Sequence, residues 1–226
     1  MHSVTSDDVE LSRLTLQASV IDPVTIRHLA LVGVAEDWKC LEVGAGSGSI
    51  AQWLSRRVGS AGKVLATDID TRFLSRISAP NLEVRRHDII KDDLKEGQYD
   101  IAHCRKLLHH LHEPEKALSK MADAVRPGGW LLIEEDDLGS HLSMDVTDPS
   151  LAPIAEAYRA GFDNMQKKGI SDAYFGRWVR GLVEGLGFVD VGQEGWTCMF
   201  HVSDPLERVY EMMWSASVAA GVLTQD

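Results

Sequence analysis

The sequence predicts a three-layer α/β domain with a mostly parallel central sheet, extended by helices before the first strand and after the fifth. Between residues 38 and 135, short apolar runs alternate with helical patterns, which is typical of parallel strands joined by crossover helices. Glycines follow the first apolar run, and acidic residues follow the second, third and fifth. A length of 226 residues suits one such domain with a single core.

Five strands and three helices are expected in this part of the chain. The strands cover residues 38–43, 63–67, 82–87, 99–104 and 130–133. The helices cover residues 50–58, 71–77 and 114–125. The first helix is indicated by Ile50, Leu54 and Val58, which recur at helical spacing. The last begins at Pro114, because the missing N–H of proline costs nothing in a first turn.

Composition excludes several classes of function. The formal net charge of −11 argues against a generic nucleic-acid binder, since phosphate contacts need clustered Lys and Arg. Cys40, Cys104 and Cys198 are too irregularly spaced for a disulfide framework or a zinc site, which indicates a reducing compartment. No signal peptide and no run of about 18 apolar residues is visible, so a cytoplasmic protein without a membrane span is expected.

The loop after the first strand carries glycines at alternate positions, Gly44, Gly46 and Gly48. Such glycines let the backbone turn tightly and approach a ligand, although a Gly-rich turn alone is also compatible with a simple loop. Ser49 stands where a dinucleotide fingerprint has its third glycine, and Glu42 precedes the loop. A pyrophosphate is an anion, so an acidic residue such as Glu42 beside the loop would disfavour its binding. S-adenosylmethionine carries an ammonium, a sulfonium and one carboxylate, and therefore tolerates Glu42.

Acidic residues end the next two strands. Asp68 follows Gly48 by twenty residues, where an acid accepts hydrogen bonds from both ribose hydroxyls. Asp88 ends the third strand, where its carboxylate would accept a hydrogen bond from the adenine amine. The N–H of Ile89 would donate to the adenine ring, and its side chain would cover one face of that ring. Either Asp alone is explained as well by a strand-end turn. The occurrence of both acids at the carboxyl ends of consecutive strands favours a ligand site.

Residues 38–135 resemble the core of class I, or Rossmann-like, S-adenosylmethionine-dependent methyltransferases. The matching pieces, in family order, are Leu41–Gly48, Val64–Asp70, Arg86–Ile89, Tyr99–Cys104, Leu107–Leu111 and Val125–Ile133. The resemblance implies a seven-stranded sheet, S-adenosylmethionine as methyl donor, S-adenosylhomocysteine as product and an acceptor site above the fourth and fifth strands. It implies that the cofactor is bound by Glu42, Gly44, Ala45, Gly46, Gly48, Asp68, Ile69, Asp88, Ile89 and Cys104.

The remaining segments are expected to belong to the same domain, which would span residues 1–226. Its parts are a helical N-terminal lid, a cofactor-binding core, an acceptor-side helical insertion and a sheet edge with a C-terminal helix, at residues 1–37, 38–137, 138–187 and 188–226. The lid is expected to break at Asp22 and Pro23. The insertion is expected to form helices at 151–168 and 173–186.

The C-terminal part departs from the family pattern. A sixth strand is expected at 188–191, and a final helix begins at Pro205. The family normally closes its sheet with a seventh, antiparallel strand, and none is visible after this helix. Either Trp196–Val202 plays that part or the chain ends short of it. A chain that ends soon after its last helix also fits a homodimer in which that helix pairs with its copy.

Histidines follow the fourth strand, where the acceptor approaches in this fold. His110 is a candidate general base, with a structural role as the alternative because the family carries a histidine here whatever the acceptor. His141 is a second candidate base. His109 and His112 have spacing that suits a metal, but Pro114 breaks the register, so no metal site is expected.

An acidic run, Glu134 to Asp137, follows the fifth strand. Four adjacent carboxylates are most often a solvated loop, although Asp136 would also suit a cationic or hydroxyl-bearing acceptor. Arg105, after the fourth strand, either binds an acidic acceptor or pins the loop.

These patterns predict an S-adenosylmethionine-dependent methyltransferase acting on oxygen, nitrogen or activated carbon of a small organic acceptor. Family members that resemble this chain at Trp38–Val43 and at the His110-Leu111 turn mostly modify small metabolites, often quinones or natural products. One alternative is an RNA or protein methyltransferase, against which the net charge and the absence of an Asn-Pro-Pro-Tyr-type motif argue. Another is a non-catalytic S-adenosylmethionine-binding partner module.

Overall fold

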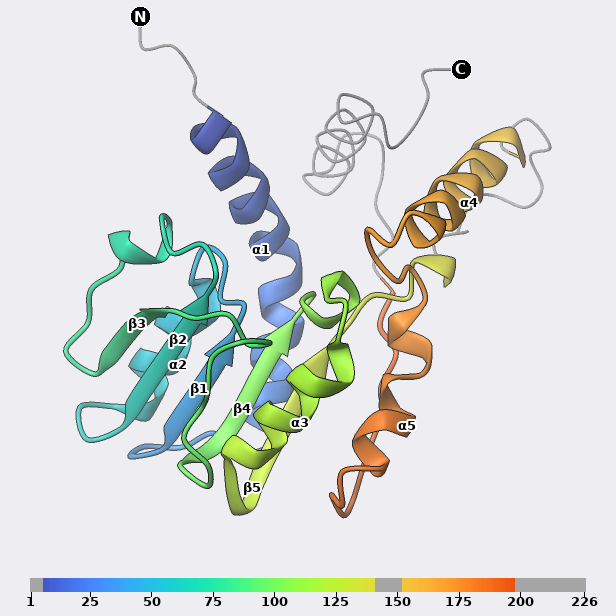
Figure 1. Ribbon diagram of the computed structural model, residues 1–226. Helices are drawn as coiled ribbons and strands as arrows, with labels where there is room; N and C mark the ends of the chain where they lie inside the picture. Colours follow the sequence, from blue (N-terminus) through green and yellow to red (C-terminus); the bar gives the residue numbers. More distant parts are fainter. Residues whose placement is uncertain (1–5, 141–151, 198–226) are drawn as a thin grey trace, which may run out of the picture. The chain divides into compact units, whose positions relative to one another are not determined.

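The computed structural model describes residues 6–140 and 152–197 (Figure 1). The chain divides into two compact units, and each is described by itself. The first comprises residues up to Leu107 together with Glu115–Glu134. The second comprises Leu108–Pro114 and the chain from Glu135 onward. None of the helices in the described ranges is both long and apolar enough to cross a membrane.

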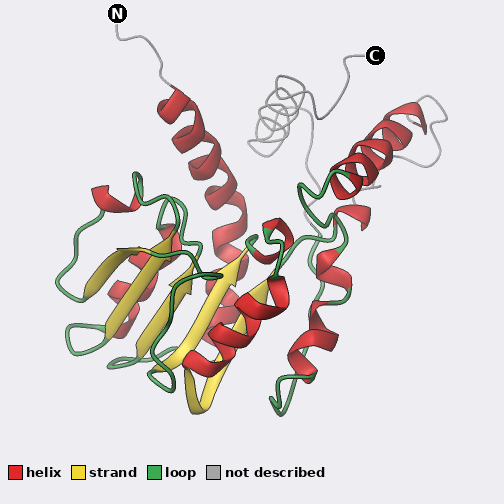
Figure 2. Ribbon diagram, in the orientation of Figure 1, coloured by secondary structure: helices red, strands yellow, loops and turns green. Residues whose placement is uncertain are grey.

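The first unit is built on a five-stranded sheet. Its strands are β1 (Lys39–Val43), β2 (Lys63–Asp68), β3 (Leu82–Arg86), β4 (Tyr99–Arg105) and β5 (Val125–Glu134). They lie in the order β3-β2-β1-β4-β5, and every neighbouring pair is parallel (Figure 2). The strand order reverses between β1 and β4, which is where open α/β sheets bind their ligands.

Helices cover both faces of this sheet. In Figure 1, α2 (Ser49–Val58) lies behind it and α3 (Pro114–Ala124) in front. The core behind the sheet joins the C-terminal part of the first helix, α2 and three strands through Leu29, Val34, Cys40, Ile50, Leu54, Val58, Val64 and Ile101. Each of these residues is at most 2% exposed, so their burial stabilises this layer. The predicted three-layer α/β fold with a mostly parallel sheet is confirmed.

Two predicted elements near the strands differ in detail. Residues 71–77 form only a short 3-10 helix, η1 (Leu74–Arg76). β5 begins at Val125, directly after α3, and not at residue 130. Val125 pairs with Tyr99 instead of ending the helix, and the register shifts between Tyr99 and Ile101, opposite the Pro-Gly-Gly segment that interrupts the apolar pattern.

The N-terminal helix α1 (Ser6–Leu31) runs unbroken through Pro23. The predicted break at Asp22 and Pro23 is therefore wrong. A proline inside a helix costs about 3 kcal/mol through the lost hydrogen bond and the steric clash. Here the turn after Pro23 is held by tertiary contacts, because Thr25 and Leu29 are fully buried within the first unit.

The second unit is helical where it is described. Its elements are η2 (Leu108–His110), η3 (Leu138–Ser140), α4 (Ala152–Lys167), η5 (Phe175–Arg177) and α5 (Val179–Glu184). The helix predicted at 151–168 is confirmed, whereas 173–186 splits into η5 and the short α5.

The sixth strand predicted at 188–191 is wrong. None of these residues is extended in a sheet, Val189 is 83% exposed, and Asp190 has a φ of +58°. A left-handed residue interrupts an extended run, and an apolar side chain in solvent gives no reason for pairing. The end of the Trp196–Val202 segment and the helix predicted from Pro205 lie outside the described residues.

Candidate functional site

The glycine loop joins β1 to α2 at the carboxyl edge of the sheet. Gly44, Gly46 and Gly48 have φ values of +71°, +56° and +78°, a region that side chains other than glycine rarely adopt. The loop is held against β2, because the N–H groups of Gly44 and Ala45 both donate to the carbonyl of Thr67, at 2.8 and 3.0 Å. The alternating glycines are therefore required by the backbone.

Gly48 has a second reason to be glycine. A Cβ at this position would lie 2.2 Å from Cδ1 of Ile77 and 2.8 Å from Cδ2 of Leu74. The loop thus packs directly on η1, and α2 begins at the next residue with no side chain capping Gly48. The first N–H groups of a helix have no partner within the helix and can bind an anion. Such an arrangement suits a ligand that carries a carboxylate.

Asp68 lies at the end of β2 beside this loop. Its Oδ2 accepts a hydrogen bond from the N–H of Gly46 at 2.9 Å, and its Oδ1 accepts from the N–H of Asp70 at 2.9 Å. Each carboxylate oxygen keeps a further lone pair. The carboxylate is therefore oriented by backbone donors and can still accept hydrogen bonds from a diol.

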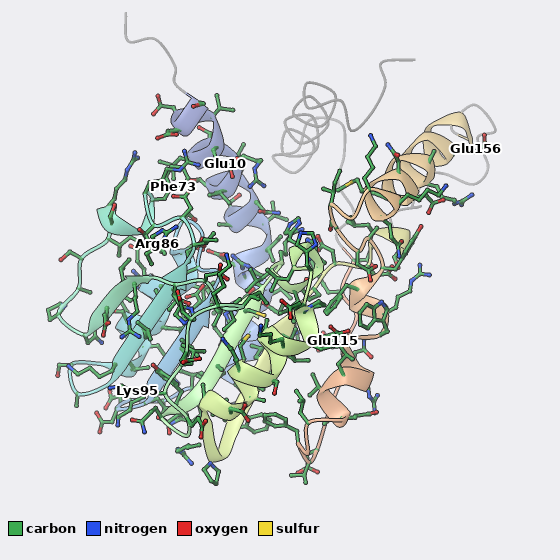
Figure 3. The ribbon with its side chains drawn as sticks, in the orientation of Figure 1. Glu10, Phe73, Arg86, Lys95, Glu115 and Glu156 are labelled. Carbon is green, nitrogen blue, oxygen red and sulfur yellow. The ribbon has the colours of Figure 1, made fainter. Side chains whose placement is uncertain are left out.

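Asp88 and Ile89 follow β3, whose end is marked by Arg86 in Figure 3. A hydrogen bond from Lys91 at 2.9 Å lowers the pKa of Asp88, and the N–H of Ile90 donates to its Oδ1 at 3.0 Å. Ile89 is buried, whereas Ile69 after β2 is 57% exposed. The register pairs Asp68 with Arg86, so both predicted acids lie at the same edge of the sheet.

Glu42 and Cys104 occupy buried positions at the carboxyl ends of β1 and β4. Glu42 is 5% exposed, and its Oε2 has no hydrogen-bond partner among the described residues. Burial raises the pKa of Glu42 to about 8. Cys104 is fully buried and pairs in register with Val43, while Ala45 is 8% exposed. The structure thus brings the predicted cofactor residues of four segments to one edge.

A buried polar network lies next to this edge, and the sequence reasoning missed it. Glu134, the last residue of β5, accepts hydrogen bonds from Thr25 at 2.6 Å and pairs with His28 at 2.7 Å. The ring of His103, fully buried in β4, is 3.3 Å from the same carboxylate. Burial alone would raise the pKa of Glu134, but the bonds from His103, Thr25 and His28 lower it to about 2.

Arg105 extends this network toward the glycine loop. Its guanidinium donates to Thr25 at 2.8 Å and to Asp22 at 2.9 Å. Asp22 also accepts from the hydroxyl of Ser49, the first residue of α2, at 3.1 Å. Arg105 therefore ties α1 to the sheet, a role that differs from both the acceptor binding and the loop anchoring predicted for it. The available signal was the spacing of Asp22, Thr25 and His28, three residues apart on one face of α1.

Of the two predicted catalytic histidines, the structure describes His110, which belongs to the second unit. His110 is exposed at the end of η2. His141 lies outside the described residues. The neighbouring His109 is buried, and its Nδ1 forms a hydrogen bond with the carboxylate of Glu135. Glu135 also accepts the N–H of Leu108 at 2.7 Å, so it anchors η2.

The interpretation of Glu134–Asp137 as a solvated loop is wrong. The side chains of Glu134 and Glu135 are 15% and 0% exposed and carry the bonds described above. Asp137 accepts from Arg177 at 2.8 Å and from Ser140 at 2.6 Å, and these bonds outweigh burial and lower its pKa. Three of the four carboxylates therefore organise the fold around them. The main-chain carbonyl of Asp136 accepts the N–H of Gly176 at 3.0 Å.

A cavity of about 220 Å³ lies within the second unit. It is lined by Leu138, Gly139, Arg159, Phe162, Tyr174 and Arg177. Arg177 is already paired with Asp137 and lies 5.1 Å from the centroid of the Tyr174 ring. Within residues 6–140 and 152–197, no group of three or more His, Cys, Asp and Glu side chains could hold a metal ion.

Comparison with known proteins places the chain in a methyltransferase family. Residues 11–179 match the family described as a methyltransferase domain. Methyltransferase str3 of Strobilurus tenacellus is 28% identical over 185 residues, which are 81% of this chain and 64% of that protein. The ubiquinone biosynthesis O-methyltransferase of Hydrogenovibrio crunogenus is 32% identical over 117 residues, which are 49% of this chain and 48% of that protein. This chain therefore spans less than two thirds of the length of either curated relative.

A solved structure shares the fold. A SAM dependent methyltransferase from Aquifex aeolicus superposes with a TM-score of 0.52 at 23% identity, over 71% of this chain and 77% of that chain.

Proposed function

We propose that this chain, which belongs to the methyltransferase domain family, transfers a methyl group from S-adenosylmethionine to oxygen, nitrogen or activated carbon of a small organic acceptor. The observation that carries the proposal is the glycine loop between Glu42 and α2. Three left-handed glycines there expose backbone beside a buried acid that has an unpartnered oxygen. This donor set fits a ligand with a cationic amino group next to a carboxylate.

In this proposal each strand end holds one part of the cofactor. Gly44, Gly46 and Gly48 frame the amino-acid end, with Ala45 and Cys104 beside them. Asp68 binds the ribose hydroxyls, and its orientation by two backbone N–H groups supports that role. The adenine is held by Ile69, Asp88 and Ile89.

The protein's own contribution is mainly proximity and orientation. The bound cofactor supplies a methyl group that its sulfonium already activates. Holding an acceptor in line with that carbon removes much of the entropic barrier. Where the acceptor must lose a proton, His110 and His141 remain the proposed bases.

Small organic acceptors are favoured over macromolecules. One relative is named for ubiquinone biosynthesis, and the net charge of −11 opposes binding to RNA. The thiol of Cys40, which is buried and forms no disulfide in the part of the chain that the structure describes, supports a reducing compartment, the cytoplasm.

A transfer assay with a labelled methyl donor tests the function. Label should appear in small phenols, quinols or amines from a metabolite panel, and not in total RNA or protein. Label in RNA or protein alone would establish the macromolecular alternative. Cofactor binding without transfer to any of the three would favour a non-catalytic partner module.

Replacing Asp68 with Ala should weaken S-adenosylmethionine binding by about 1–3 kcal/mol, or roughly 5- to 150-fold in Kd, because charge-assisted hydrogen bonds to the ribose are lost. Calorimetric titration measures the change. Asp70→Ala is the matched control, since Asp70 is exposed and its carboxylate bonds Arg72. Equal affinity of Asp68→Ala and the wild type would remove Asp68 from the ribose site.

A further inference from the structure

Glu42 is an ionisable group enclosed inside the sheet beside the glycine loop. It lies on β1 between β2 and β4, paired in register with Ala66 and His103. Only 5% of the residue is exposed. Because its Oε2 has no partner among the described residues, an ionised carboxylate here would lack both water and a hydrogen-bond donor on that oxygen.

The charges that face Glu42 are mostly negative. Among the described residues, Asp22 from α1, Asp68 from β2 and Glu134 from β5 oppose its ionisation, whereas Arg105 from β4 favours it. The guanidinium of Arg105 also donates a hydrogen bond to Asp22, so its positive charge is partly balanced by that carboxylate.

Two imidazoles also lie close to this group of charges. His103 on β4 and His28 on α1 both bond Glu134, whose carboxylate they stabilise.

Burial is the largest cause that raises the pKa of Glu42 to about 8, and the three neighbouring carboxylates raise it further against Arg105. At pH 7 the cofactor-free protein therefore holds Glu42 mainly in its protonated form. The side chain is in effect a neutral acid placed two residues before the first loop glycine.

The ligand expected at this loop brings the missing positive charge. S-adenosylmethionine has an α-ammonium group at its amino-acid end, the end that the glycines are proposed to frame. An opposite charge within a few ångströms favours the ionised form of a carboxyl group. In a buried site the pair then replaces a neutral acid that had one unpartnered oxygen.

We propose that Glu42 gives up its proton when S-adenosylmethionine binds, so that its carboxylate pairs with the α-ammonium and each binding event releases about one proton to solvent. The O–H bond of Glu42 breaks, the proton passes to buffer, and the carboxylate left behind balances the ammonium charge. This inference rests on the proposed function, because it needs the cofactor to bind at the glycine loop.

Isothermal titration calorimetry counts such protons. S-adenosylmethionine is titrated into the wild type at pH 6.5 in buffers of different ionisation enthalpy, and the slope of observed enthalpy against buffer enthalpy gives the protons exchanged. At this pH the cofactor's own amino group, with a pKa of about 7.7–8.0, is already charged and takes up almost none. The wild type should release close to one proton.

Two variants assign the proton. Glu42→Gln mimics the neutral acid and should release almost none, while Glu83→Gln, the same change on the exposed face of β3, should behave as the wild type. His28 and His103 are unchanged in both variants. A wild type that binds S-adenosylmethionine with no proton release, or a Glu42→Gln variant that binds with undiminished release, would overturn the inference.

Two further measurements use the wild type alone. Its affinity should rise with pH between 6 and 7.5, by up to about tenfold per unit, and a flat profile would contradict the inference. S-adenosylhomocysteine, which keeps the ammonium but lacks the sulfonium charge, should release the same proton. Release with S-adenosylmethionine only would exclude the ammonium as partner. No binding of either compound would instead refute the proposed function.

Discussion

Replacing Glu42 with Gln is expected to raise the free energy of unfolding of the cofactor-free protein by about 3–5 kcal/mol at pH 9 and by much less at pH 5. The cause is the burial that raises the pKa of Glu42 from 4.5 to about 8. Between these values the folded protein holds a proton that the unfolded chain has lost. Stability that is fully present below pH 4.5 is therefore lost as pH rises to about 8, and Gln removes this loss.

Urea denaturation of the wild type and Glu42→Gln at pH 5, 7 and 9 measures the effect. The gap between the two proteins should widen steadily with pH. Glu83→Gln controls for the change of net charge, because Glu83 is exposed and paired with Arg85 on the surface. A gap that stays constant from pH 5 to 9 would show that Glu42 titrates as it does in an unfolded chain.

Replacing Glu134 with Gln should have the opposite effect to Glu42→Gln. We expect it to lower the free energy of unfolding by about 2–3 kcal/mol at pH 7. Hydrogen bonds from His103, Thr25 and His28 outweigh burial and lower the pKa of Glu134 from 4.5 to about 2. The ionised carboxylate therefore stabilises the fold above pH 4.5. That contribution is lost as pH falls through about 2.

Chemical denaturation at pH 7 checks this second prediction, and the difference from the wild type should shrink as pH is lowered from 5 toward 2. Glu96→Gln, at an exposed turn, is the matched control and should be nearly neutral. Equal stability of Glu134→Gln and the wild type at pH 7 would mean that the network does not hold α1 on the sheet.

Much of the sheet and its ligand edge was predictable because the signals there are local. An apolar strand followed by glycines and a helix can be read within one stretch of chain, as in Cys40 to Val58. The positions of Asp68 and Asp88 were predictable for the same reason, since each stands at the end of a strand-like run in the sequence. The strands predicted before these residues are present in the structure as β1, β2 and β3.

The polar network and the C-terminal part were not predictable in the same way. Thr25 and Glu134 are separated by 109 positions, and only the assembled sheet brings them together. The acidic run was therefore misread as a solvated loop. The pattern at 188–191 looked like a strand, but local periodicity does not report whether a neighbouring strand is present to pair with it.

The glycine loop is expected to bind S-adenosylmethionine and not a dinucleotide. Calorimetric titration of the purified chain with each compound at pH 7 tests it directly. Saturable binding of S-adenosylmethionine, with no detectable heat from NAD at the same concentrations, is the predicted result. Tight NAD binding with no S-adenosylmethionine binding would contradict the account.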